Sequence, residues 1–150
     1  MHRLPNIFAA MLMAFALSAC AAQPAQQQAA IIPPAADALA ALEGILAAYA
    51  EGQTLHVETK VEPAMIGYQQ WIDAMRLSHA QQKQIRIALH DTQVVNGSDT
   101  VTIRSAWDKR YLSLPELSPV LRKGQSVFLM QLTQDGWKLA AQSGDNLFAP

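Results

Sequence analysis

Three side chains have the chemistry of a general acid or base: His79, His90 and Asp91. Acid–base catalysis needs such a group to point inward, within reach of a reacting proton. Asp91 has no visible partner, and His79 falls on an apolar face, where a histidine is more often structural than functional. We therefore assign no catalytic residue. An enzyme that uses an inward Asp or His remains the alternative.

Metal and cofactor sites have little support in the sequence. The chain has one cysteine, Cys20, which excludes an internal disulfide and a cysteine-based metal cluster. His56, Glu58 and Glu62 alternate along one short segment, but nothing else with ligand spacing lies nearby. The formal net charge of −1 provides no basic footprint for nucleic acid. We predict no metal, no cofactor and no nucleic-acid partner.

Large apolar side chains offer a different chemistry, the binding of a small apolar ligand. They occur at helical or strand spacing, which is more often the mark of a packed core than of a pocket. The candidate ligand-binding residues are Tyr68, Trp71, Met75, Trp107, Tyr111 and Met130.

Residues 1–19 have the features of a secretory signal peptide. An apolar run over residues 7–17 follows one basic residue and is too short for a spanning helix. The next residues, Leu17-Ser18-Ala19-Cys20, resemble a bacterial lipobox, in which cleavage leaves a lipidated cysteine. The resemblance implies that acyl chains on Cys20 anchor the protein in a membrane, and a neutral Ala21 resembles outer-membrane sorting. An ordinary secretory signal, with Cys20 incidental, is the alternative.

The chain after Cys20 divides into a tether and one domain. Residues 20–36 are rich in Ala, Gln and Pro, have no apolar period and are predicted to form a flexible tether. Residues 37–150 are long enough for one compact domain and too short for two.

Apolar spacing predicts two helices in the first half of this domain. Residues 37–51 carry one apolar face, with Asp37 as N-cap and Gly52 as C-cap. Residues 68–82 carry a second apolar face. The segment between them alternates, which suggests a short strand without excluding a helical turn, and Pro63 interrupts it.

Alternation predicts long strands in the second half. Residues 84–95 and 100–112 flank an Asn-Gly-Ser-Asp turn that pairs Val94 with Val101. The apolar phase slips within the first strand, so we predict a β-bulge at His90-Asp91. Beyond the bulge, Arg86 is then expected opposite Asp108. Residues 113–122 contain two prolines and are predicted to form a loop or a frayed connection.

The last two strands are predicted to form a hairpin over residues 126–148. Asp135-Gly136 between alternating apolar residues is a strong hairpin signal. A two-residue turn there pairs Gln134 with Trp137, Leu132 with Leu139, Met130 with Ala141 and Phe128 with Ser143. The expected inner face comprises Phe128, Met130, Leu132, Trp137, Leu139 and Ala141. The expected outer face comprises Val127, Leu129, Gln131, Thr133, Ala140 and Gln142.

Helices followed by antiparallel strands indicate an α+β domain. The chain resembles the NTF2-like (SnoaL-like) superfamily in residues 39–52, in the strand–turn–strand of residues 85–103, and in residues 136–139 and 143–148. The resemblance implies a curved antiparallel sheet of at least four strands that curls around the N-terminal helices into a cone. The interior of such a cone is either a ligand pocket or filled core. Dimers through the outer sheet face are also implied.

Together these features predict an envelope lipoprotein that is held in the bacterial outer membrane and faces the periplasm. Its NTF2-like domain is expected to bind a small apolar ligand, a glycan or an envelope protein without catalysis. The resemblance also admits isomerases, cyclases and dehydratases. A domain with a solid interior that only docks partners is a third hypothesis, and a cavity of about 300 Å³ would separate it from the first.

Overall fold

The computed structural model describes residues 35–150. The predicted signal peptide and Cys20 therefore lie outside the described residues. The helices are α1 (Ala35–Ala50), α2 (Thr54–Thr59) and α3 (Tyr68–Gln81), and the strands are β1 (Gln82–Asn96), β2 (Thr100–Ser113), β3 (Ser118–Thr133) and β4 (Gly136–Gly144).

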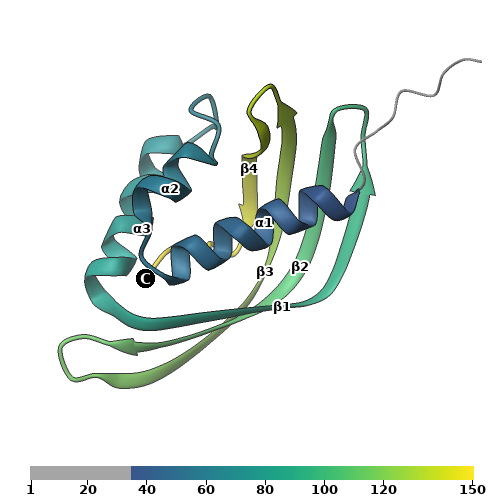
Figure 1. Cartoon of the computed structure of the whole chain (residues 1–150). Helices are drawn as coiled ribbons and strands as arrows, with labels where there is room; N and C mark the ends of the chain where they lie inside the picture. Colours follow the sequence, from purple (N-terminus) through teal and green to yellow (C-terminus); the bar gives the residue numbers. More distant parts are fainter. Residues whose placement is uncertain (1–34) are drawn as a thin grey trace, which may run out of the picture.

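The helices pack on one face of a single curved antiparallel sheet (Figure 1). The strand order is β1-β2-β3-β4, so each strand pairs with its sequence neighbour. α1 crosses the inner face and contacts β1, β2 and β4, while α2 and α3 cover one end. The predicted α+β cone is confirmed.

The first helix begins earlier than its sequence pattern indicated. α1 starts at Ala35, which places Asp37 in its first turn, so the predicted N-cap is wrong. The acidic side chain still suits the position, because the N-terminal end of a helix favours negative charge. The predicted end is close, since Gly52 adopts a φ of +76° after the last turn.

The segment between α1 and α3, which the sequence left open between a strand and a helical turn, contains both a short helix and a strand-like contact. α2 forms at Thr54–Thr59, and Val57 is its one buried residue. Val61 then forms a parallel bridge with Leu139, just before Pro63 ends the extended stretch. The alternating pattern therefore could not be assigned to one element.

The predicted bulge in β1 is confirmed, one residue further along. Asp91 and Thr92 together face Ser105, and Asp91 has a φ of +49°. The register nevertheless differs from the prediction by two residues, since Val94 pairs with Ile103. A shift of two keeps every side chain on its expected face, so the hydrophobic pattern could not detect it.

That shift changes which outer-face charges meet. Arg86 pairs with Arg110 instead of Asp108, and Ala88 takes the place opposite Asp108. A second register irregularity, between Lys83 and Arg86, follows Gln82 at the start of the strand. The predicted Arg86–Asp108 pair is wrong.

The predicted loop or frayed connection at residues 113–122 is shorter than expected, because residues 114–117 alone form the turn between β2 and β3. β3 begins at Ser118, and its ladder with β2 is uninterrupted from the turn to Gln131. Pro119 lies opposite Leu112, in a stretch where β4 does not reach β3. A proline is tolerated in such a one-sided stretch because its missing N–H can face away from the paired strand.

The closing hairpin forms with a different register. Gly136 has a φ of +96° and pairs with Thr133, so the two-residue turn is Gln134-Asp135, one residue earlier than the predicted Asp135-Gly136. Met130 consequently pairs with Leu139, and the four predicted pairs are wrong. A bulge beside Ala140 then reverses the following phase, which puts Ala141 on the outer face and Gln142 on the inner face. The rest of the predicted inner face is buried or partly buried.

Candidate functional site

The sequence predicted a candidate ligand pocket in the interior of the cone. Four of the six candidates are buried in the core: Trp71, Met75, Trp107 and Met130. Tyr68 and Tyr111 are partly buried against it. The six residues come from α3, β2 and β3, and the fold directs most of them to the same core.

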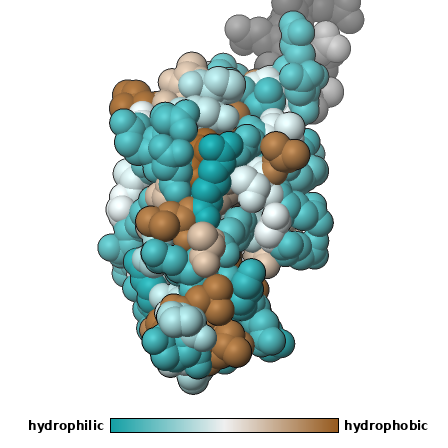
Figure 2. All heavy atoms as spheres, turned by 90° about the vertical axis from the view of Figure 1, so that its left-hand side faces the viewer, coloured by the Kyte–Doolittle hydropathy of each residue, from teal (hydrophilic) through white to brown (hydrophobic). Residues whose placement is uncertain are grey.

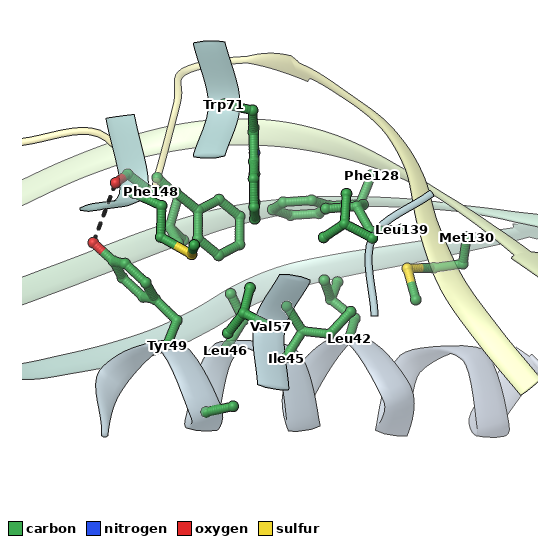
Figure 3. Packing of buried hydrophobic residues seen from close by; sticks show 14 of the residues in the cluster. Leu42, Ile45, Leu46, Tyr49, Val57, Trp71, Phe128, Met130, Leu139 and Phe148 are labelled. Atoms are coloured by element: carbon green, nitrogen blue, oxygen red, sulfur yellow. Dashed lines mark hydrogen bonds between the residues drawn. The ribbon is translucent and has the colours of Figure 1, made fainter. Parts of the chain in front are cut away.

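The C-terminal segment fills the centre of that interior. Leu147 and Phe148 are fully buried. The Phe148 ring lies between Tyr49 of α1 and Trp71 of α3, with ring centroids 5.0 Å and 4.5 Å away (Figure 3). The Tyr49 hydroxyl also donates a hydrogen bond of 3.3 Å to the Phe148 carbonyl. Phe148 therefore occupies the space next to Trp71.

Both buried indoles have polar partners within the protein. Trp71 Nε1 donates to Gln142 Oε1 at 2.7 Å, which is the contact that the β4 bulge makes available. Trp107 Nε1 donates to Ser126 Oγ at 2.8 Å. Gly124 leaves room for the Trp107 ring, because a Cβ there would lie 2.4 Å from it. These bonds make both tryptophans part of the packed structure.

A buried lysine lies at the same end of the cone. Lys109 is fully buried, and its Nζ donates to Tyr49 Oη at 2.7 Å and Ser78 Oγ at 3.1 Å. It also reaches two carbonyls of the C-terminal segment, Ala149 O at 2.9 Å and Leu147 O at 3.1 Å. The lysine thus ties α1 and α3 to that segment.

Burial controls the protonation of this cluster. Desolvation lowers the pKa of Lys109 to about 7, and the charge of Arg122 acts in the same direction. Desolvation raises the pKa of Tyr49 to about 12, against the effect of its hydrogen bond with Ser78. An amine with such a pKa could exchange protons near neutrality, but full burial keeps it from substrate. Its contacts indicate a structural clamp.

Lys109 was not among the candidate residues predicted from the sequence. Its position in the alternating pattern of β2 could have revealed it. Val101, Ile103, Ser105 and Trp107 point to the inner face, and Lys109 is the next residue in that series. A lysine in phase with a buried series is unusual, since lysine is almost never fully buried unless paired.

The three acid–base candidates do not converge. His79 Nε2 donates to the Tyr49 carbonyl at 2.7 Å, and His79 Nδ1 is 3.2 Å from Thr54 Oγ1, so both ring nitrogens are used. His90 lies on the outer face, where its Nε2 is 3.7 Å from Asp108 Oδ1. Asp91 is exposed in the bulge. One candidate is therefore a bonded structural histidine, and two face solvent.

Structure comparison shows what fold these elements make. An NTF2-like superfamily protein from Salmonella enterica matches with a TM-score of 0.64 at 6% identity, over 74% of this chain and 89% of that one. A ketosteroid isomerase-like protein from Erwinia carotovora matches with a TM-score of 0.58 at 16% identity, over 71% and 91%. The fold of this chain is NTF2-like.

A third similar structure is the CaMKII hub of S. rosetta, with a TM-score of 0.59 at 18% identity over 75% of this NTF2-like chain and 97% of the hub. No protein-family model and no curated protein matches the sequence. The likeness to solved structures therefore establishes the fold of the NTF2-like domain and leaves its activity to its own residues.

Hollows of the NTF2-like domain lie outside its core. One of about 360 Å³ lies on the outer face of β1, β2 and β3 and is lined by Gln84, Arg86, Arg110, Tyr111, Leu112, Pro119, Val120 and Leu121. A second, of about 310 Å³, lies between α1 and β1 and is lined by Glu43, Leu46, Ala47, Ala50, Ile87 and Leu89. Tyr111 borders the first hollow from β2, although its ring centroid lies 5.5 Å from Lys109 Nζ on the inner side.

Within residues 35–150, no group of three or more His, Cys, Asp or Glu side chains is arranged to hold a metal ion. No helix in that range is long and apolar enough to cross a membrane.

Proposed function

We propose that the chain is a lipid-anchored envelope protein whose NTF2-like domain binds a ligand or partner without catalysing a reaction. The observation that carries this proposal is the filled interior. Leu147 and Phe148 occupy it, and Lys109 holds their segment in place with two hydrogen bonds to its backbone. Binding is therefore proposed at the outer surfaces of the domain.

The positions of the acid–base candidates support the absence of catalysis. Both nitrogens of His79 are bonded inside the protein, while His90 and Asp91 lie on the solvent side. General acid–base chemistry needs a poised group beside an accessible substrate site. The buried Lys109 lacks that access.

The anchor is proposed from Leu17-Ser18-Ala19-Cys20. Acyl chains on Cys20 would hold the protein at the outer membrane, and residues 20–34 would link them to α1. α1 begins at the end of the sheet opposite the β2–β3 turn (Figure 1). That turn would then lie at the end of the domain far from the attachment point.

A homodimer is proposed through the outer face of β3 and β4. Its corrected surface comprises Val127, Leu129, Gln131, Thr133 and Ala141. The mixed character of this surface, where Lys138 opposite Gln131 is ion-paired with Glu62 and Asp135, suits an isologous contact between two copies. The similar hub structure supports an assembly role for this fold.

Membrane fractionation of the full chain, expressed in a bacterium with two membranes, tests the anchor. We expect the wild type in the outer-membrane fraction and the Cys20→Ser variant in the soluble periplasmic fraction. Ala22→Ser, a small change close to the cleavage site, is the matched control and should stay with the membrane. Retention of Cys20→Ser in the membrane would contradict the proposal.

A further inference from the structure

Two arginines face each other across the outer face of the sheet. Arg86 of β1 and Arg110 of β2 are register partners, and both are exposed. Both line the outer hollow of about 360 Å³, which we call the diarginine groove. Like charges directly opposite in a sheet are destabilising. An anionic group between the two side chains would compensate this repulsion.

Residues 35–150 do not provide that compensation. Asp108 is the acidic residue nearest along β2, and it lies 3.7 Å from His90 Nε2 and 3.9 Å from Lys123 Nζ. Neither groove arginine takes part in an ion pair found within the described residues. The cations that do are Arg76, His90, Lys123 and Lys138. Two guanidinium groups are thus left available on one small surface.

The remaining walls of the groove are mainly apolar. Leu112, Pro119 and Leu121 share the outward phase of the neighbouring strands, and Leu121 is 48% exposed. Hydrophobic side chains gather at the lower end of the molecule in Figure 2, where the β2–β3 turn lies, while most of that face is hydrophilic. Charge and apolar surface therefore adjoin within one hollow.

We propose that the diarginine groove binds a soluble amphiphilic anion. A carboxylate or phosphate group would lie between Arg86 and Arg110, and a short apolar body would lie on Leu112 and Leu121. Guanidinium groups match planar oxyanions with paired hydrogen bonds, and a bound anion would remove the repulsion between them. A hollow of this size fits a small molecule. This inference rests on the proposed function of binding without catalysis and names its ligand class.

The position of the groove favours a soluble ligand over a membrane lipid. It lies beside the β2–β3 turn, at the opposite end of the sheet from Ala35 (Figure 1). A domain tethered through residues 20–34 would therefore have its groove at the end of the sheet far from the attachment point.

Binding of octyl phosphate below its micelle concentration tests this inference, by calorimetry and by NMR shift mapping. We expect octyl phosphate to bind at least about tenfold more tightly than inorganic phosphate or octanol. Inorganic phosphate lacks the apolar chain, and octanol lacks the anionic group. Arg86→Gln and Arg110→Gln should each weaken binding by about tenfold or more. Arg104→Gln removes an exposed arginine elsewhere on the outer face of β2 and is the matched control.

Three results would overturn the inference: no binding of octyl phosphate, an equal loss in the Arg104→Gln control, or binding only to anionic phosphatidylglycerol vesicles. Circular dichroism of each variant confirms that the fold is retained, and the exposed positions of the three arginines favour this. Octyl phosphate binding and membrane release of Cys20→Ser are independent results. If octyl phosphate does not bind but Cys20→Ser is still released from the membrane, the lipid-anchored binding protein remains the proposal and only the diarginine groove is rejected as its ligand site.

Discussion

At the scale of single residues, Lys109 is the most unusual feature of this NTF2-like domain. An ammonium group in an apolar interior is disfavoured, and its pKa falls to about 7 for that reason. Four hydrogen bonds nevertheless satisfy it, two of them to backbone carbonyls of the C-terminal segment. The side chain therefore joins α1 and α3 to the C-terminal segment. Because its pKa is lowered, its ammonium group loses its proton more readily than that of an exposed lysine.

The pH dependence of stability should report this lysine. Its pKa is lower in the folded state than in the unfolded state, so the unfolded chain binds more protons between the two values and stability rises with pH there. We expect the free energy of unfolding to rise by up to about 1.4 kcal/mol per pH unit from roughly pH 7.5 to 9.5. Above about pH 10 the raised pKa of Tyr49 acts in the opposite sense, because the unfolded tyrosine ionises first.

Urea unfolding at several pH values measures this effect. Lys109→Met should remove the rise, whatever its effect on stability at one pH. Lys123→Met makes the same exchange at an exposed lysine of β3 and should retain the rise. Identical pH profiles for wild type and Lys109→Met would show that Lys109 does not titrate in this range.

At the scale of elements, the C-terminal segment decides whether the cone is hollow. Leu147 and Phe148 follow β4 and turn back into the space between α1, α3 and the sheet. Asn146 begins this turn, since its Oδ1 accepts a hydrogen bond from the Phe148 N–H at 3.0 Å. Two residues outside any helix or strand thus complete the core.

Truncation of Phe148 should both destabilise and hollow the domain. We expect Phe148→Ala to lower the free energy of unfolding by about 3–5 kcal/mol, the usual cost of removing a buried aromatic ring. Phe148→Leu keeps more volume and should cost less. Urea unfolding measures both, and benzene binding to Phe148→Ala, followed by NMR, would detect the new apolar cavity. Equal stability of wild type and Phe148→Ala would show that the segment does not fill the interior.

At the scale of the whole molecule, the sheet has two distinct outer regions. The β3–β4 region carries Val127 and Leu129 and is proposed to contact a second copy. The region near the β2–β3 turn carries the diarginine groove. Because they occupy different parts of the sheet, one domain could dimerise and still bind a ligand.

The proposed dimer should respond to one charge in its contact surface. A buried carboxylate without a partner is costly, so Leu129→Glu should convert the dimer to a monomer. Leu55→Glu makes the same change at a residue of α2 that is 77% exposed on the helical side, and it should remain dimeric. Sedimentation equilibrium distinguishes the two states. A monomeric wild type would contradict the dimer.

Much of the fold was predictable because periodicity reports burial. The apolar spacing of residues 68–82 located α3, and the phase slip near His90 located a bulge from the sequence alone. Shifting a strand by two residues preserves its faces, however, so the partners of Arg86 and Met130 were assigned wrongly. The alternation of apolar residues therefore predicts the sheet face of a residue more reliably than its partner on the neighbouring strand.

The sequence by itself therefore determined the α+β class, the two longer helices and the inner faces of most strands, since these depend on residues close together in the chain. Tertiary structure alone decided that Phe148 lies against Trp71, that Lys109 reaches the C-terminal carbonyls and that Arg86 faces Arg110. Those contacts join residues far apart in sequence, and they depend on register, on bulges and on how the sheet curves around α1 and α3.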